Sequence, residues 1–164
     1  MVKSIVEYAK ERGIRVVPEF DIPGHAYSWG KGYPDLTVSC PNYQSNINNV
    51  PLNPTLNSTY DMLSQVIPEM ASLFYDNYFH IGGDEVVYGC WEDNTEVVNW
   101  MNQNGYTATQ TLQYFEDNLQ PIVEGAGKSA VCWEDLYDDG VDVPSNYIIE
   151  VLFLSSSLPF IINN

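Results

Sequence analysis

The sequence predicts an α/β fold in which parallel strands alternate with helices along the chain. Two patterns support this fold class: short apolar runs typical of buried strands, and longer segments whose apolar residues recur at helical spacing. A third observation bounds the size, because 164 residues with 45% hydrophobic content suit one domain with a sizeable core. We therefore expect a single domain built around a parallel sheet.

The first two expected elements are a helix and a strand. Apolar residues between Val2 and Ala9 fall at helical spacing, charged residues fill the other face, and Gly13 is expected to end the helix. Residues 14–20 read as a buried strand that leads into a loop. The stretch 28–54 has no clear period, so a long loop is predicted there, and loops of that length are usually functional or disordered.

Helices and strands then alternate as far as residue 153. A helix is predicted to begin at a cap formed by Asn57 or Ser58 and to kink at Pro68. Two further helices are predicted to end at Gly105 and Gly125, where glycine interrupts an apolar helical pattern. The remaining predicted strands are 78–81, 129–133 and 147–153.

The charge of the chain excludes two classes of partner. The formal net charge is −16 with six lysines and arginines, so there is no basic footprint for nucleic acid or an anionic membrane surface. No apolar run approaches the ~18 residues of a membrane span, and the amino terminus lacks a signal-peptide pattern. Such acidity suits either an ordinary solvated surface or a protein that works in acid, and the composition leaves both open.

The run from His80 to Glu85 carries the clearest chemistry. Asp84 and Glu85 are adjacent carboxylates at the end of a predicted strand, where Gly82 and Gly83 break the pleat and let both side chains line one pocket. Carboxylates that share a pocket have their pKa values pushed apart, which leaves one protonated acid and one ionised partner. That arrangement can cleave a glycosidic bond, although an exposed turn with two solvated charges would have the same residues.

Four motifs in order resemble one enzyme family. The runs 16–25 (VVPEFDIPGH), 80–85 (HIGGDE), 90–91 (CW) and 131–134 (VCWE) are together similar to the family 20 glycoside hydrolases, the β-N-acetylhexosaminidases. The resemblance covers roughly residues 1–152 and implies a catalytic (β/α)8 barrel. Because such barrels take about 250 residues, we expect an incomplete (β/α)8 TIM-type barrel of about four β/α units over residues 1–154, followed by a divergent C-terminal tail at 155–164.

The resemblance also implies the chemistry. It implies that the protein removes terminal non-reducing β-linked N-acetylhexosamine (GlcNAc or GalNAc) from glycans by substrate-assisted retaining catalysis, without a cofactor. Glu85 would be the general acid and base, and Asp84 would orient and charge-stabilise the acetamido group. Trp133 would form an aromatic wall for the sugar, His25 would support the acid, and Asp21 would orient His25. Each residue also has a plain structural interpretation: a loop ion-pair partner, a core tryptophan or a structural histidine.

The remaining residue predictions concern cysteine, metal and glycan chemistry. The resemblance implies a disulfide between Cys40 and Cys90, whereas Cys132 lies in an apolar strand and is predicted to be a buried free thiol. With two histidines in the whole chain we expect no metal site. Asn57 begins a glycosylation triplet, which has meaning only on the secretory route. The resemblance implies a lysosomal or secreted location, with an address encoded upstream of this chain.

Departures from the family pattern leave the activity open. An arginine, a tyrosine and a tryptophan with an acidic partner, which the family supplies from other strands, lie outside this chain, and Leu152 stands where the family often has tryptophan. Four strands cannot close an eight-stranded barrel, so a sheet edge and apolar surface would be exposed unless a second copy, in a homo-dimer, or another chain covers them. The alternatives to an active glycosidase are an inactive truncated sugar-binding remnant and an interaction scaffold.

Overall fold

A short parallel sheet forms the centre of the protein. The computed structural model describes residues 1–43 and 50–152. Within them, β1 (Tyr78–Gly82), β2 (Ser129–Trp133) and β3 (Ile148–Glu150) pair in that order, each parallel to the next. The predicted parallel α/β class is therefore confirmed, and β1 and β2 lie where the sequence placed them. The expected strand 147–153 is shorter within the described residues, because only β3 pairs regularly.

The expected strand over residues 14–20 forms only a fragment of sheet. Glu19 makes an isolated parallel bridge with His80, and the His80 amide donates to the Pro18 carbonyl (2.9 Å). Pro18 itself has no amide hydrogen to donate, and Ile14 is 58% exposed. The prediction of a buried, regularly paired strand is therefore wrong for its first half. The segment still runs parallel to β1, so the sheet carries a fourth extended stretch, as about four β/α units require.

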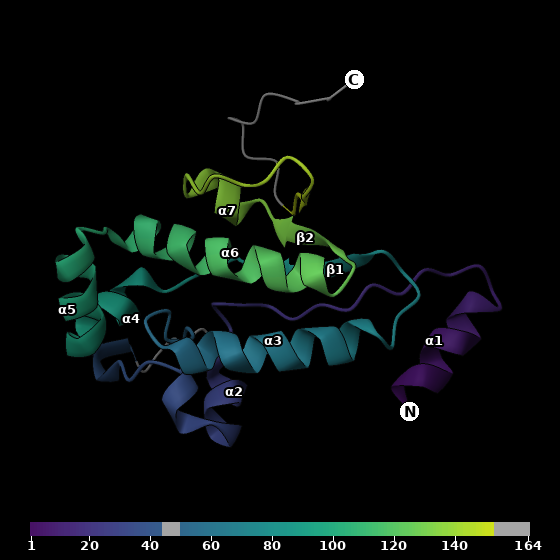
Figure 1. Ribbon diagram of the computed structural model, residues 1–164, viewed down its shortest axis with the longest axis horizontal. Helices are drawn as coiled ribbons and strands as arrows, with labels where there is room; N and C mark the ends of the chain where they lie inside the picture. The colour runs from purple at the N-terminus through teal and green to yellow at the C-terminus, as the bar shows by residue number, and fades with distance from the viewer. Residues whose placement is uncertain (44–49, 153–164) are drawn as a thin grey trace.

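Two long helices cover one face of the sheet. The helix α3 (Asn57–Ala71) packs on α6 (Ala108–Gly125), and α6 packs on β2 (Figure 1). The start of α6 is fixed by a capping box in which Thr107 and Gln110 exchange hydrogen bonds between side chain and backbone. The helix ends at Gly125, as the sequence predicts.

The start of α3 differs from the predicted cap. Leu56 occupies the N-cap position, and no side chain caps the helix there. A side chain of the first helical turn bonds instead to the turn before the helix: the Thr59 hydroxyl, on a residue 1% exposed, donates to the Asn53 carbonyl (2.7 Å). The Asn53 side chain in turn accepts from the Thr55 amide (3.0 Å). The helix continues past Pro68 to its end.

The shorter helices lie at the two ends of the molecule. The helix α1 (Val2–Lys10) is at one end, whereas α4 (Tyr88–Asp93) and α5 (Thr95–Asn104) are at the other (Figure 1). Glycines with φ of 69° and 68° follow α1 and α5, at the predicted stops Gly13 and Gly105. The predicted loop 28–54 contains α2 (Tyr27–Gly32) and a 3-10 turn, Pro34–Leu36. Elements this short show no helical period, which is why the sequence did not reveal them.

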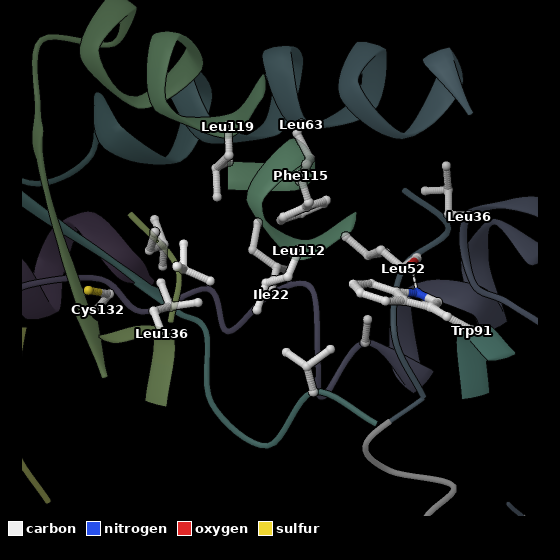
Figure 2. Packing of buried hydrophobic residues seen from close by; sticks show 14 of the residues in the cluster. Ile22, Leu36, Leu52, Leu63, Trp91, Leu112, Phe115, Leu119, Cys132 and Leu136 are labelled. Atoms are coloured by element: carbon white, nitrogen blue, oxygen red, sulfur yellow. Dashed lines mark hydrogen bonds between the residues drawn. The ribbon is translucent and has the colours of Figure 1, made fainter. Parts of the chain in front are cut away.

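The core lies between the helices and the sheet. Figure 2 shows Leu63 of α3 and Phe115 and Leu119 of α6 gathered in one layer, and each of these residues is at most 1% exposed. The core continues under α4, where the buried Trp91 ring donates from Nε1 to the Leu52 carbonyl (3.0 Å). Burying each such side chain is worth about 1.5–3 kcal/mol. This core holds the helices against one face of the sheet, which we call the outer face, and so holds the strands in place.

The opposite face of the sheet is open. Side chains from the extended segment and all three strands line a shallow hollow there: Arg15, Val17, Glu19, Tyr78, His80, Val131, Trp133, Ile148 and Glu150. Apolar residues in and just after the last strand are exposed, with Ile148 at 41% and Leu152 at 63%. This exposed inner face agrees with the predicted incomplete (β/α)8 barrel.

Candidate active site

Two glycines turn the chain at the end of β1 and set up the site. Gly82 and Gly83 have φ of 73° and 95°, a region that favours glycine. A Cβ on Gly82 would overlap the Asp21 carboxylate, and one on Gly83 would lie 2.7 Å from the Leu136 side chain. The glycines therefore let the chain leave the sheet while it stays close to two neighbouring segments.

The next turn is held in an unusual backbone conformation. Glu85 and His25 both have φ of 49°, although neither is glycine. A left-handed conformation costs a non-glycine residue about 1–2 kcal/mol, and it persists only where the surroundings hold it. One such contact is visible, because the Glu85 amide donates to Asp135 Oδ1 (3.3 Å).

The predicted residues Asp21, His25, Asp84 and Glu85 meet at one point. His25 Nε2 lies 3.6 Å from Asp21 Oδ2 and 3.6 Å from Asp84 Oδ2. The same nitrogen lies 3.5 Å from Glu85 Oε2. These side chains come from the end of the extended segment and from the end of β1, so the structure assembles them from two motifs that are 55 or more residues apart in the sequence.

Asp21 and Asp84 form the close carboxyl pair. Burial, and after it the charge of Asp84 and a side-chain hydrogen bond with Asp84, together raise the pKa of Asp21 to about 8. The Gly83 amide, which donates to Asp21 Oδ1 (3.2 Å), acts in the opposite direction. Asp21 is therefore a carboxyl that keeps its proton near neutral pH. Sequence reasoning expected one protonated carboxyl within the pair Asp84 and Glu85, whereas the raised pKa belongs to Asp21.

The Glu85 carboxyl is open to solvent, with a side chain that is 64% exposed. Its position in a left-handed turn beyond the sheet carries it away from the core, whereas the Asp21 side chain, 23% exposed, stays beside the strand. Asp21 is therefore more enclosed than Glu85, and burial raises the pKa of Asp21.

Trp133 lies on the open face of the sheet, apart from the carboxylates. It is the last residue of β2, and its Nε1 donates to Glu19 Oε1 (3.2 Å). Its ring centroid is 4.7 Å from that of His80, at an angle of 58°. The half-buried ring can therefore serve as an aromatic surface in the hollow described above, together with Glu19.

His80 and Glu19 belong to the quoted motifs, yet sequence reasoning gave them no role. His80 Nδ1 accepts the Gly82 amide (3.0 Å), and Nε2 lies 3.6 Å from Glu150 Oε2. Burial lowers the His80 pKa, although the charges of Glu19 and Glu150 oppose that shift. An accepting Nδ1 places the proton of a neutral imidazole on Nε2, toward Glu150. Both residues occupy paired positions on the open face of the sheet, and this placement could have identified them as site candidates.

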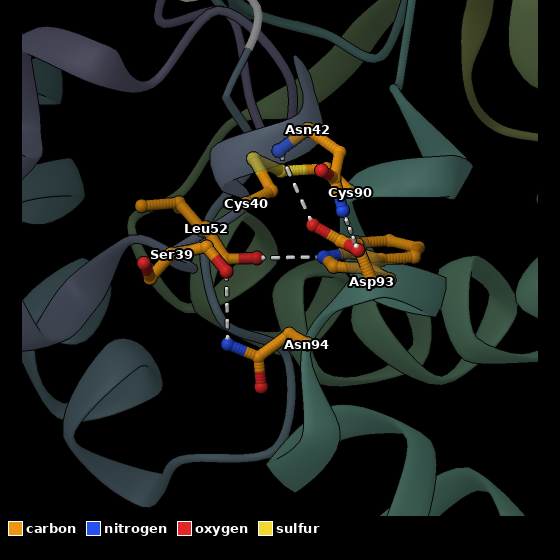
Figure 3. Close-up of a disulfide and its surroundings, with 8 residues drawn as sticks. Ser39, Cys40, Asn42, Leu52, Cys90, Asp93 and Asn94 are labelled. Carbon is orange, nitrogen blue, oxygen red and sulfur yellow. Dashed lines mark hydrogen bonds between the residues drawn. A yellow bond between two sulfur atoms is a disulfide. The ribbon is translucent and has the colours of Figure 1, made fainter. Parts of the chain in front are cut away.

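The predicted disulfide is present. Cys40 and Cys90 are joined, with their Cα atoms 5.0 Å apart (Figure 3). Around it, the Asn42 side chain donates to Asp93 Oδ1 (2.5 Å), and the Asn94 side chain donates to the Ser39 carbonyl (3.2 Å). The bond therefore ties the loop after the 3-10 turn to α4, which begins soon after the turn that carries Asp84 and Glu85.

Cys132 is a buried free thiol, as predicted. Burial raises its pKa to about 12, with a smaller contribution from the charge of Glu116. A thiol that keeps its proton at neutral pH is a poor nucleophile and a poor metal ligand. Cys132 therefore contributes packing to the outer face of β2.

Metal ligands were not expected from the histidine count, but the folded chain brings one set of candidates together. Asp21, His25 and Asp84 each offer one atom within 4.8 Å of the others, the one such group found in the described ranges. Acidic groups often adopt this spacing without an ion, and the spacing assigns none here. Of the described helices, none is long and apolar enough to cross a bilayer.

Comparison with known proteins agrees with the motifs. The profile of glycosyl hydrolase family 20, catalytic domain, matches residues 1–152. The chain is 43% identical over 163 residues to beta-hexosaminidase subunit A1 of Dictyostelium discoideum, covering 99% of this chain and 31% of that protein. It is 39% identical over 153 residues to human beta-hexosaminidase subunit beta, covering 92% of this chain and 28% of that protein.

Solved structures give the same result. The family 20 exo-β-N-acetylglucosaminidase of Vibrio harveyi, solved in complex with N-acetylglucosamine, superposes with a TM-score of 0.79 at 29% identity, over 92% of this chain and 24% of that one. The chain thus spans about a third or less of the length of these relatives. Over that span, fold, motifs and sequence agree, and the chain belongs to glycosyl hydrolase family 20.

Proposed function

We propose that this chain supplies the acid–base part of a site that hydrolyses terminal β-linked N-acetylhexosamine. The observation that carries the proposal is the meeting of Asp21, Asp84 and Glu85 around His25 Nε2, at 3.5 to 3.6 Å. These residues lie beyond the carboxyl ends of the extended segment and β1, on the face where (β/α) barrels carry out their chemistry. Family membership supports the same reaction class.

Glu85 acts as the general acid. Its carboxyl is 64% exposed, so a glycosidic oxygen can reach it. The proton passes from Glu85 to the leaving oxygen as the bond from that oxygen to the anomeric carbon breaks, and the alcohol departs. His25, 3.5 Å away, lies close enough to hold the carboxylate that remains.

Asp84 orients the nucleophile, which belongs to the substrate. The carbonyl oxygen of the 2-acetamido group attacks the anomeric carbon, while Asp84 accepts a hydrogen bond from the amide nitrogen. The raised pKa of Asp21, caused first by burial and then by Asp84, lets Asp21 keep its proton beside Asp84. Water then attacks the anomeric carbon and gives its proton to Glu85, while the bond between that carbon and the acetamido oxygen breaks. The acetamido group is regenerated, the acid is restored, and the configuration is retained.

The substrate class follows from this chemistry and from the aromatic surface. A terminal GlcNAc or GalNAc supplies the acetamido group, and the ring of Trp133 provides a flat apolar wall for the sugar. The hydrogen bond from its Nε1 to Glu19 (3.2 Å) supports a fixed ring orientation. The partners are therefore glycans or glycoconjugates that end in N-acetylhexosamine.

Location and assembly belong to the same proposal. The Cys40–Cys90 disulfide supports a lysosomal or secreted protein, because disulfides persist in oxidising compartments. The exposed Ile148 and Leu152 support closure of the inner face by further chain, a second copy or another subunit. Asn57, exposed at the start of α3, is the glycosylation site that this location implies.

Release of a chromogenic phenol from its N-acetyl-β-glucosaminide tests the proposal. The wild-type chain, Glu85→Gln and Asp84→Asn are compared at mildly acid pH, with N-acetylglucosamine binding measured in parallel. Turnover that is lost in both variants supports the assigned roles. Binding without turnover in any of the three proteins would indicate the sugar-binding remnant, and self-association with neither would indicate a scaffold; both results overturn the proposed activity.

A further inference from the structure

The short helix α7 (Asp135–Asp138) lies directly against the turn that carries the catalytic pair. The Glu85 amide donates to Asp135 Oδ1 (3.3 Å). Leu136, 1% exposed, packs on Gly83 so closely that a Cβ there would come within 2.7 Å of its Cγ. Two successive residues of α7 therefore contact the backbone on both sides of Asp84.

A third contact fixes the far end of the same turn. The Tyr88 hydroxyl donates to Asp139 Oδ2, one residue beyond α7, at 2.5 Å. The helix is itself anchored to the sheet, because the Glu134 amide donates to the Glu150 carbonyl (3.0 Å) and the Glu134 carboxylate accepts the Leu152 amide (2.9 and 3.0 Å). The turn after β1 is thus braced against a fixed element that follows β2.

Glu85 depends on such a brace more than its neighbours do. Its φ of 49° lies in the left-handed region, which a non-glycine residue leaves unless a contact holds it. The bond to Asp135 acts directly on the Glu85 backbone amide, at the residue that has this conformation. Relaxation to an ordinary conformation would swing the carboxyl away from His25, which now lies 3.5 Å from it.

We propose that Asp135 is a positioning residue for Glu85, and that its carboxylate holds the left-handed turn that aims the acid at the site. The proposal rests on the catalytic role proposed above for Glu85. Asp135 does not touch the substrate in this scheme, and it acts only through the Glu85 backbone. Burial raises the pKa of Asp135, and the charges of the facing Asp84, Glu134 and Asp139 act in the same direction. The hydrogen bond from the Glu85 amide lowers this pKa, because it favours the ionised carboxylate that accepts the bond.

Three variants separate positioning from simple structure. Asp135→Ala removes the acceptor, and Asp135→Asn keeps an acceptor oxygen of similar size without the charge. Asp138→Ala removes an exposed carboxylate from the same helix and serves as the matched control. Thermal unfolding of each variant shows whether the fold is retained.

The first readout is the Glu85 amide, followed by NMR and by hydrogen exchange in the folded chain. A hydrogen bond to a carboxylate is worth about 1.5–3 kcal/mol, so Asp135→Ala should lower the protection of this amide about tenfold or more. Asp135→Asn should retain much of the protection, but the amide shift should no longer follow the titration of a carboxyl group. Unchanged protection in Asp135→Ala, or equal loss in Asp138→Ala, would overturn the proposal.

The second readout is catalytic and concerns the intact enzyme. Because Asp135 acts on the acid rather than on sugar binding, Asp135→Ala should lower kcat at least tenfold with KM nearly unchanged, and Asp135→Asn should recover part of the loss. A rise in KM at constant kcat would refute the positioning role. If the wild type shows no hydrolysis, the proposed function fails, while the amide measurement still decides whether Asp135 holds the turn.

Discussion

Replacing Glu116 by glutamine is expected to make the folded protein less sensitive to pH. Glu116 lies in α6, is 4% exposed, and has no hydrogen-bond partner for either carboxylate oxygen within the described residues. Burial raises its pKa from 4.5 to about 8, and the charge of Asp117 adds a smaller contribution. An unpaired carboxylate is costly to bury, so the folded protein keeps this side chain protonated where the unfolded chain does not.

The sign and size of the effect follow from these two pKa values. Below about pH 4.5 Glu116 is protonated in both the folded and the unfolded state, and the side chain does not oppose folding. Between about pH 4.5 and 8 the unfolded state releases this proton and the folded state keeps it, so the free energy of unfolding falls as pH rises. At about 1.4 kcal/mol per pH unit, stability falls by at most about 5 kcal/mol across this range. The groups that face Glu116 from the packed elements are themselves neutral there: Tyr60 of α3, Cys132 of β2 and Tyr147 before β3.

Urea unfolding followed by circular dichroism at about pH 4.5, 6 and 8 measures this effect. The free energy of unfolding of the wild type should fall with pH, and Glu116→Gln should remove up to about 5 kcal/mol of that fall. Asp117→Asn, which deletes the same charge from an exposed position of α6, is the control and should leave the slope nearly unchanged. Should the glutamine variant fold poorly, Glu116→Met tests the same point. A wild-type slope retained in both neutral variants would refute the reasoning.

Four further predictions concern the site and its supports. Gly83→Ala should lose at least about 2 kcal/mol of unfolding free energy in urea, through its φ of 95° and its contact with α7, whereas Gly140→Ala, with positive φ but open space, should lose less. Asp21→Asn should reduce the fall in unfolding free energy between about pH 4 and pH 8. In the wild type, Asp21 stays protonated in the folded state over this range, whereas the unfolded state releases the proton; a steeper fall in the variant would contradict this. Cys40→Ser, which opens a bridge across 50 residues, should cost about 4 kcal/mol, seen equally when the wild type is reduced. Asn57→Gln should abolish a glycan mass shift in protein secreted by eukaryotic cells; an unchanged mass of the wild type, without glycan, would refute the site.

Much of the fold could be predicted because its strands and long helices carry strong patterns. The strand 129–133 is a continuous apolar run, and α6 shows an apolar stripe closed by glycine, so both were placed correctly. The segment 14–20 is also largely apolar, but it contains Pro18, which has no amide hydrogen to donate, and it makes only an isolated bridge to β1. Apolar content predicts burial only where a partner element is present.

The sequence identified which residues form the candidate site, but not which of their side chains contact one another. Asp21, His25, Asp84 and Glu85 were identified from motifs, and the structure brings them around one nitrogen. Which carboxyl keeps a proton depends on burial, and burial beside a neighbouring segment leaves no mark in the local sequence. Asp135 was missed for the same reason, because its contact with Glu85 joins residues 50 apart.

The buried Thr59 hydroxyl determines whether glycosylation of Asn57 must come before folding. Asn57 is exposed, yet the third residue of its acceptor triplet is 1% exposed and its hydroxyl is bonded to Asn53. A glycosylating enzyme that must engage this hydroxyl can do so only before the turn closes and α3 forms. A glycan on Asn57 would therefore show that the chain was modified before this turn and α3 had formed.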